Sequence, residues 1–351
     1  MIEVTLSTLP NQTPPLTTQR TMSEADQLPL LIEPAAPDLD PLAWAATHRE
    51  AIDRGLTRCG AILFRGFALH SPAQFEAFAE ALSPGLHGQY GDLPKNDGGN
   101  NIYHSTPYPE KQMILFHNES SHLPSWPRRQ WFFCETPSPI GGATPIVDTR
   151  EMLRRMPPEL VDQFERKGLL YIRTFDRDLD VSWQDFFKTQ DPAAVEARCR
   201  ASGVDFAWLD GGKLLQTRTL CHAIVRHPDS GERIFFNQIQ LHHPSCLGQA
   251  LREDLIDLVG EDRLPRNVLF GDGSVIDDHT VALIGRLYEA CAVRPRWQKG
   301  DVVMVDNMLV AHARDPFEGP RKIVVAMGRM MSRSELPPLT STTTNLSKEI
   351  V

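Results

Sequence analysis

Hydrophobic and polar residues follow two different periods along this chain, and the period changes where glycine and proline gather. Helical spacing of apolar residues predicts helices at 41–55 and 72–82, each with proline at its first position. Further helices are predicted near 149–156, 183–200, 247–259 and 280–292, and another is predicted to restart at Pro157-Pro158 with Leu160 and Phe164 facing inward. Short apolar runs predict strands at 61–67, 112–119, 130–134, 144–147, 206–208, 214–217, 223–226, 234–237, 301–306 and 322–327.

Short strands separated by glycine- and proline-rich turns predict a mainly β fold, a sandwich or barrel decorated with helices. Strict alternation of strands and helices is absent, as are GxGxxG and GxxxxGK[ST] motifs, so dinucleotide-binding and P-loop folds are not supported. We expect a flexible leader over 1–27, one domain over 28–331 with a helical insertion at about 149–295, and a disordered tail over 332–351. The segment 85–101, rich in Gly, Asn and Asp, predicts a long loop of the lid or binding type.

Composition and charge narrow the functional classes. The 351 residues are 41% hydrophobic, which is typical of a globular protein with a sizeable core. A formal net charge of -9 argues against general nucleic-acid binding, which needs a basic face. No apolar run is long enough to span a bilayer, and no secretory signal is predicted. The six cysteines are scattered without a CxxC pair, which favours free thiols and a cytoplasmic location.

Three His-x-Asp/Glu pairs are candidate metal-binding motifs, because residues i and i+2 of a strand project to the same face. They are His48/Glu50, His227/Asp229 and His117/Glu119. The first lies within a predicted helix, where i and i+2 point in different directions. The second belongs to a His-Pro-Asp-Ser-Gly turn, in which the aspartate is expected to cap the turn. The third ends an apolar strand and enters a polar loop, and it is the strongest candidate.

A third ligand is expected late in the chain, at His312 in the run DNMLVAHAR. Two histidines and one carboxylate form a facial triad that leaves coordination positions open on non-haem iron. Arg321 follows and could grip the distal carboxylate of a co-substrate through two parallel hydrogen bonds. Thr144, after Gly141-Gly142, could add a hydroxyl group. An ordinary surface arginine and a strand-edge threonine are the plainer explanations of these two residues.

Five segments carry a resemblance to a known family: HNESSH, FFCETPSPIGGATPIVDTR, FFNQIQLHH, LPRNVLFGDGS and WQKGDVVMVDNMLVAHARDPFEGPRKIVVAM. Together they resemble the taurine dioxygenase/clavaminate synthase superfamily, and most of all its SyrP-like (syringomycin-type) amino-acid β-hydroxylases. The similarity covers residues 61–327. It implies a double-stranded β-helix (jelly-roll) core, Fe(II) bound by His117, Glu119 and His312, and a site for the distal carboxylate of 2-oxoglutarate at Arg321 and Thr144.

The resemblance also implies a reaction. An enzyme of this kind uses Fe(II), 2-oxoglutarate and O2 to hydroxylate an unactivated C–H bond. Related halogenases have a small residue where this chain has Glu119, so hydroxylation rather than chlorination is expected. The implied substrate is an amino acid, oxidised at its β-carbon in nonribosomal peptide biosynthesis, with aspartate tethered to a carrier protein as one candidate. One departure is His122, where the subgroup usually has an aromatic residue.

Substrate contacts and competing functions stay open at this point. Polar residues that could bind substrate are Asn237, Gln238, His243, Arg218, Arg226 and Arg128, and ordinary structural roles explain each equally well. One alternative is the same chemistry on a free small acid or amino acid, as in taurine dioxygenase. More remote alternatives are a non-catalytic jelly-roll binding protein and a zinc hydrolase. No nucleic-acid or membrane partner is expected, and the oligomeric state is not predicted.

Overall fold

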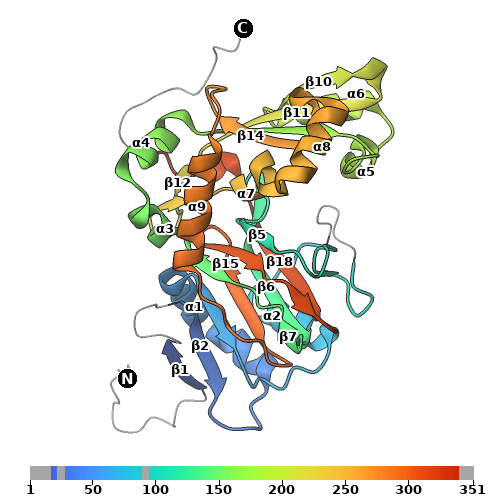
Figure 1. Cartoon of the computed structure of the whole chain (residues 1–351). Helices are drawn as coiled ribbons and strands as arrows, with labels where there is room; N and C mark the ends of the chain where they lie inside the picture. Colours follow the sequence, from blue (N-terminus) through green and yellow to red (C-terminus); the bar gives the residue numbers. More distant parts are fainter. Residues whose placement is uncertain (1–16, 22–27, 89–94, 340–351) are drawn as a thin grey trace. The chain divides into compact units, whose positions relative to one another are not determined.

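The computed structural model describes residues 17–21, 28–88 and 95–339 (Figure 1). Within this part the chain forms two compact units. The first contains residues up to 120 together with 125–148 and 291–331, and the second contains 121–124, 149–290 and the residues from 332 onward. Each unit has its own sheets and helices, so each is described by itself.

The first unit is built on a seven-stranded sheet. Its strands, in spatial order, are β1 (Thr17–Thr21), β2 (Leu30–Pro34), β3 (Ala61–Phe64), β15 (Val302–Asp306), β6 (Ser125–Thr136), β18 (Lys322–Ser332) and β4 (Ile102–His104). Strands β2 and β3 run parallel, whereas β15 is antiparallel to both β3 and β6. Strands from opposite ends of the sequence are therefore neighbours at the centre of the sheet.

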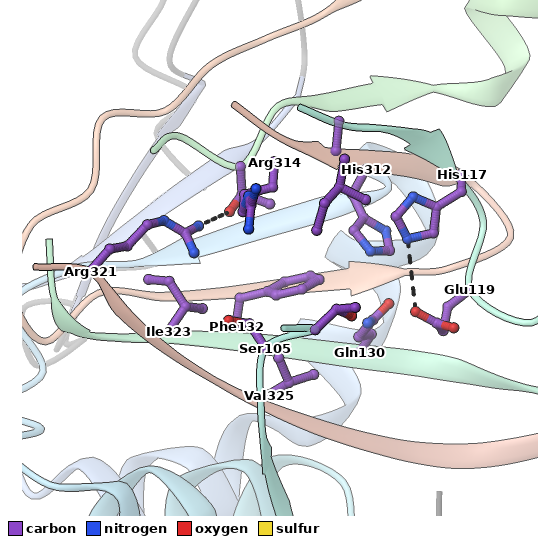
Figure 2. A pocket seen from close by; sticks show the side chains of 14 residues that line it. Ser105, His117, Glu119, Gln130, Phe132, His312, Arg314, Arg321, Ile323 and Val325 are labelled. Carbon is purple, nitrogen blue, oxygen red and sulfur yellow. Dashed lines mark hydrogen bonds and ion pairs between the residues drawn. The ribbon is translucent and has the colours of Figure 1, made fainter. Parts of the chain in front are cut away.

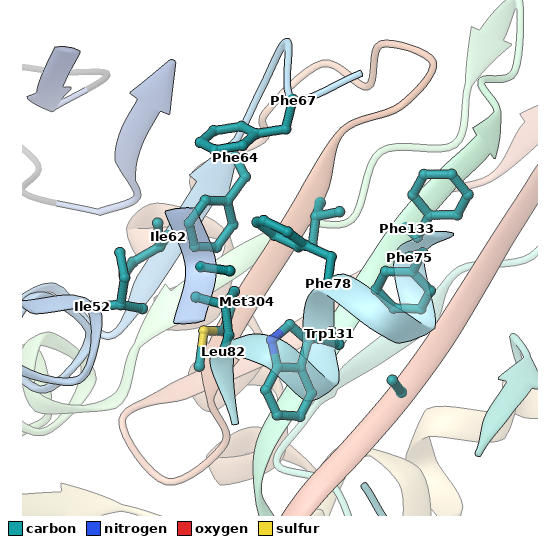
Figure 3. Close-up of a cluster of buried hydrophobic side chains, with 14 of the residues drawn as sticks. Ile52, Ile62, Phe64, Phe67, Phe75, Phe78, Leu82, Trp131, Phe133 and Met304 are labelled. Carbon is teal, nitrogen blue, oxygen red and sulfur yellow. The ribbon is translucent and has the colours of Figure 1, made fainter. Parts of the chain in front are cut away.

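One face of this sheet packs against two helices, α1 (Pro41–Cys59) and α2 (Pro72–Leu82). Asp40 and Ser71 cap the helices by accepting hydrogen bonds from backbone N–H groups of the first turn. Trp131 and Phe133 of β6 and Met304 of β15 point into the core between sheet and helices (Figure 3). Aromatic rings from β3, α2 and the intervening loop fill its centre at centroid distances of 5.3 to 5.7 Å.

The opposite face of the sheet lines a cavity. Successive side chains of a strand point to opposite faces of the sheet. Gln130 and Phe132 of β6 therefore face the cavity rather than the core, as do Ile323 and Val325 of β18. The other wall comes from a three-stranded sheet in the order β5 (Ile114–His117), β16 (Val310–Arg314) and β8 (Ile146–Asp148). A short pair, β7 (Ile140–Gly141) with β17 (Phe317–Glu318), completes the strands of this unit.

The second unit contains sheet as well as helix. A four-stranded sheet has the order β10 (Asp205–Leu209), β11 (Leu214–Cys221), β9 (Leu169–Phe175) and β14 (Arg266–Phe270), and β12 (Ile224–Arg226) pairs with β13 (Arg233–Phe235). The helices are α3 (Thr149–Arg155), α4 (Pro158–Lys167), α5 (Trp183–Phe187), α6 (Pro192–Ala201), α7 (Ile239–His242), α8 (Gln249–Val259) and α9 (Asp278–Cys291). Phe175, Trp183 and Leu215 belong to a small core of this unit.

Several predicted elements differ from the observed ones. The helix predicted at 183–200 is two helices, because Asp191 caps a new helix that begins at Pro192. Strands β9 and β14 were not predicted, so the segment expected to be a helical insertion is organised around a four-stranded sheet. Residues 17–21 of the expected leader form β1, paired with β2. Ser332 to Glu335 of the expected tail form a capped 3-10 turn rather than a disordered segment.

Other expectations fall partly outside the described residues. Residues 1–16, 22–27, 89–94 and 340–351 are not described, so the rest of the leader, the middle of the 85–101 loop and the end of the tail stay untested. None of the helices in the described part is long and apolar enough to cross a membrane. All six cysteines are free thiols.

The aromatic core of the first unit should carry a large share of its stability. Phe78→Ala would remove a fully buried ring that contacts Phe64 and Phe67, and we expect the free energy of unfolding to fall by about 3–5 kcal/mol. Urea unfolding followed by circular dichroism measures this change. Leu258→Ala, at a side chain that is 69% exposed, is the control and should change stability by less than about 0.5 kcal/mol. Equal effects of the two substitutions would contradict the assignment of this core.

Candidate metal centre

Three side chains distant in the sequence meet at one end of the cavity (Figure 2). His117 ends β5, Glu119 follows two residues later, and His312 lies in β16. Strand β16 is antiparallel to β5 with His312 directly opposite His117. One potential ligand atom from each of the three residues lies within 4.8 Å of the others. Backbone pairing therefore brings together residues that lie far apart in the sequence.

Hydrogen bonding leaves the imidazoles available to a metal. Nδ1 of His117 lies 2.8 Å from the carbonyl oxygen of Leu115, and its Nε2 lies 3.9 Å from Oε2 of Glu119. A proton on Nδ1 of His117 thus leaves the Nε2 lone pair facing the carboxylate. His312 is buried, and its Nδ1 has no hydrogen-bond partner among the described residues. Burial and the neighbouring His117 lower the pKa of His312 well below its usual value, which favours the neutral, metal-binding form.

The residues present fit a ferrous ion. Two imidazole nitrogens and one carboxylate oxygen match the facial triad of non-haem iron oxygenases, which leaves positions open for other ligands. A buried imidazole nitrogen without a hydrogen-bond partner is unusual, and a metal ion in the triad would give His312 the partner that the protein does not provide. Among the described residues, no other cluster of three or more His, Cys, Asp or Glu side chains has this geometry.

Two asparagines fix the turn that carries Glu119. Asn307 accepts a hydrogen bond from the Glu119 backbone N–H at 2.6 Å and donates from its amide nitrogen to the Glu119 carbonyl at 2.9 Å. Asn118 donates to the carbonyl oxygens of Asn307 and Val310, so the turn before His312 is tied to the turn after His117. Neither asparagine was a sequence-based candidate. The place of Asn307 within the DNMLVAH run was the available signal.

The far end of the cavity is cationic. Arg321 donates from Nε to the Gly142 carbonyl at 2.9 Å and from a terminal nitrogen to Oγ1 of Thr144 at 3.4 Å (Figure 2). Trp297 also donates to Oγ1 of Thr144, at 3.2 Å. Gly142 has φ +70°, and a Cβ there would lie 2.9 Å from Cδ of Arg321, so glycine is needed on both counts. The two residues predicted for one carboxylate are therefore neighbours.

The charge of Arg321 persists despite burial. Burial and the nearby Arg314 lower the pKa of Arg321 to about 10, so the guanidinium is positive at neutral pH. Arg314, which sequence reasoning missed, donates to the carbonyl oxygens of Tyr108, Pro109 and Gln112. It thereby holds the segment that follows the cavity-lining Ser105. Its position two residues after His312 on the same strand was the signal that could have identified it.

The other two His-x-Asp/Glu pairs have structural surroundings. His48 lies in α1, where its ring stacks on Trp44 at 4.7 Å and Nδ1 contacts the Trp44 carbonyl. His227 is buried, and its Nδ1 accepts a hydrogen bond from the Ser230 N–H in the turn between β12 and β13. Both placements agree with the structural interpretation of these pairs.

Candidate substrate residues lie in the second unit, apart from Arg128, and have local partners there. Asn237 bonds to the Tyr288 hydroxyl and the Ile239 N–H, and the backbone N–H of Gln238 donates to the Tyr171 hydroxyl. His243 contacts Ser245 and the Ile276 carbonyl, Arg226 donates to the Gly231 carbonyl, and Arg218 donates to Gln216. Arg128 lies 3.6 Å from Asp306. Arg218 and His243 line a separate cavity within the second unit. Substrate binding by these residues stays a prediction.

Asn307 should matter for metal affinity although it is not a ligand. Asn307→Ala removes both hydrogen bonds to the Glu119 backbone, so the carboxylate is no longer held, and we expect Fe(II) to bind at least about tenfold more weakly. Anaerobic isothermal titration calorimetry with Fe(II) measures this. Asn267→Ala in β14 is the control and should bind Fe(II) like the unaltered protein. Unchanged affinity of the Asn307 variant would show that the turn keeps its shape without these bonds.

Two curated proteins are similar to this chain over most of its length. The dapdiamide synthesis protein DdaC of Enterobacter agglomerans is 36% identical over 278 residues, which cover 79% of this chain and 84% of DdaC. A clavaminate synthase-like protein of Arabidopsis thaliana is 30% identical over 292 residues, covering 80% and 85% of the two chains.

Solved structures share the fold at low sequence identity. PvcB of Pseudomonas aeruginosa is 14% identical with a TM-score of 0.52, covering 93% of this chain and 94% of PvcB. A taurine dioxygenase from Burkholderia xenovorans is 15% identical with a TM-score of 0.52, covering 92% and 93%.

The family match extends over both units. Residues 25–327 match the taurine catabolism dioxygenase TauD, TfdA family. Enzymes of this family use Fe(II), 2-oxoglutarate and O2, in agreement with the His-Glu-His cluster found here. The match to the superfamily that the sequence motifs indicated is thus confirmed. The chain belongs to the TauD, TfdA family and is a 2-oxoglutarate-dependent non-haem iron dioxygenase.

Proposed function

We propose that His117, Glu119 and His312 hold Fe(II), and that Arg321 and Thr144 bind the distal carboxylate of 2-oxoglutarate in a jelly-roll core. One observation carries this proposal: the triad and the Arg321–Thr144 pair line the same cavity, between the same two sheets (Figure 2). A dicarboxylate needs a metal at one end and a cation at the other, and this cavity offers both. The facing sheets of the first unit support the jelly-roll assignment.

Each residue has a defined task in this arrangement. Bound Fe(II) supplies the oxidative chemistry with 2-oxoglutarate and O2 that hydroxylates a C–H bond. Nε2 of His117 is oriented by the Leu115 carbonyl, and Glu119 is oriented through the backbone contacts of Asn307. Arg321 offers a charge-assisted hydrogen bond, and the Thr144 hydroxyl is held in place by Trp297. Phe132, Ile323 and Val325 keep the space between them apolar.

The proposed substrate is an amino acid that is hydroxylated at its β-carbon in the synthesis of a specialised metabolite. The similarity to a dapdiamide synthesis protein supports amino-acid modification in such a setting. Aspartate tethered to a peptidyl carrier protein is the specific candidate, as the resemblance to SyrP-like hydroxylases suggests. A free amino acid or small acid is the second candidate, supported by the match to the taurine dioxygenase family. Six free cysteines support a cytoplasmic location.

Anaerobic binding followed by a product screen tests this function. Addition of 2-oxoglutarate to the Fe(II)-loaded protein should produce a weak visible charge-transfer band. Addition of O2 should then release succinate and a hydroxylated product from free or carrier-loaded amino acids, and comparison of the two forms separates the substrate candidates. Since Glu119 occupies the position at which halogenases leave room for chloride, the product in chloride buffer should still be hydroxylated. A mainly chlorinated product would contradict the role of Glu119, and absence of both band and succinate would contradict the proposed function.

Arg321 should govern the affinity for the co-substrate. Arg321→Leu replaces the guanidinium with an apolar side chain and so removes its charge-assisted hydrogen bonds. The KM for 2-oxoglutarate should therefore rise by about tenfold or more. Succinate release as a function of 2-oxoglutarate concentration measures this change. Arg294→Leu, which removes an arginine paired with Asp315 at the surface, should leave the KM unaltered. An unchanged KM in the Arg321 variant would remove Arg321 from the proposed role.

A further inference from the structure

One buried glutamine in the cavity has no use in the structure. Gln130 lies on β6 and is only 2% exposed. It lines the cavity at the end that holds the triad. Figure 2 shows Gln130 among the side chains that line this cavity together with Glu119 and His312. The amide oxygen Oε1 of Gln130 is buried and has no hydrogen-bond partner among the described residues. A buried amide oxygen without a donor destabilises the protein, so stability does not account for this glutamine, and its amide nitrogen is left as a donor for a ligand in the cavity.

The surroundings of Gln130 show which part of the cavity it serves. The other residues that the seven-stranded sheet contributes to the lining are Phe132, Ile323 and Val325, all apolar. Phe132, two residues along the same strand face, packs against His312 at a centroid distance of 5.0 Å. The strand thus places a single amide at the metal end of an otherwise apolar floor. The cationic end of the cavity, at Arg321, has its own polar groups and does not depend on Gln130.

We propose that Gln130 is a positioning residue whose side-chain amide donates a hydrogen bond to the metal-side carboxylate of bound 2-oxoglutarate. This inference rests on the proposed function, because it assumes that the co-substrate extends from Arg321 to the triad. Of the nearby groups, Nδ1 of His117 already contacts the Leu115 carbonyl, and Glu119 is itself an acceptor. Gln130 is therefore the buried amide donor that the sheet floor offers to a second carboxylate. Its amide would orient that carboxylate and with it the plane of the co-substrate.

Two substitutions at this position separate hydrogen bonding from packing. Gln130→Met keeps the length of the side chain and removes the amide, so Fe(II)-loaded protein under anaerobic conditions should bind 2-oxoglutarate about tenfold more weakly. Its charge-transfer band should also shift, because the carboxylate on the metal loses a hydrogen bond. Gln130→Glu places a negative charge opposite the carboxylate and should weaken binding further than Gln130→Met does. The readout is the dissociation constant from titration of the band, in the absence of substrate.

Thermal unfolding of the metal-free protein provides an independent readout. Gln130→Met should unfold at the same temperature as the unaltered protein or a higher one, because the buried unpartnered amide is gone. Gln216→Met is the matched control, since Gln216 is a buried glutamine that bonds to Thr174 and to the Asp262 carbonyl. This control should lower the unfolding temperature and leave 2-oxoglutarate binding unaltered.

The outcomes distinguish this inference from the function on which it rests. An unchanged dissociation constant in Gln130→Met overturns the inference, as does loss of Fe(II) binding or a fall in the unfolding temperature. An unaltered dissociation constant combined with a raised KM for the amino-acid substrate overturns it as well, and assigns Gln130 to the substrate. Failure of the unaltered protein to bind 2-oxoglutarate would instead contradict the proposed function itself.

Discussion

The antiparallel pairing of β16 with β5 is the contact on which the candidate site depends. It sets His312 opposite His117. Glu119 follows two residues after the end of β5, so the position of this strand end also limits where Glu119 can lie. Backbone hydrogen bonds of a ladder specify register to within one residue, and a slip of one residue would turn His312 away from the cavity. The Asn307 contacts to Glu119 then add side-chain hydrogen bonds to this register. The arrangement of the triad is thus decided by strand pairing, with the asparagines holding the connecting turns.

The pleat of the seven-stranded sheet separates stability from chemistry. Along β6, Trp131 and Phe133 enter the core beneath α1 and α2, whereas Gln130 and Phe132 face the cavity. Strand β18 repeats the division with Val324 on the core side and Val325 on the cavity side. The same strands therefore anchor the sheet and shape the site through alternating residues. The rigid core beneath the sheet keeps the cavity walls in place, which a site with a fixed ligand geometry requires.

The charged and polar groups of the cavity are divided between its two ends. Two arginines line this cavity, and Arg314 donates its hydrogen bonds to the backbone carbonyl oxygens of Tyr108, Pro109 and Gln112. Arg321 directs a terminal nitrogen at the Thr144 hydroxyl and carries the positive charge that an anionic ligand needs. The imidazoles of His117 and His312 lie at the other end, where burial holds the pKa of His312 well below its usual value. Charge and lone pairs are thus placed at opposite ends of one apolar space, which suits a small dianion bound to a metal.

The sequence alone was sufficient for the parts of the protein that depend on local patterns and on recognisable motifs. Proline and capping residues predicted the start of α1 and α2, and a short apolar run predicted the strand that carries His117, whereas β16, which carries His312, was not predicted as a strand. The His-x-Glu pair, the late histidine and the arginine after it were sufficient to predict the type of centre. These features are local because side-chain direction within a strand depends only on neighbouring residues.

Tertiary structure decided what depends on contacts between distant segments. Strands β9 and β14 were missed because the pairing that makes them strands joins residues about a hundred positions apart. Asn307 and Arg314 lie near His312 in the sequence and Gln130 does not, but the role of all three follows from what folding places beside them or leaves without a partner. The division into two compact units likewise follows from contacts, since both units are assembled from separated stretches of chain. The local sequence specifies which side chains can form the site, and the pairing of distant strands decides where these side chains meet.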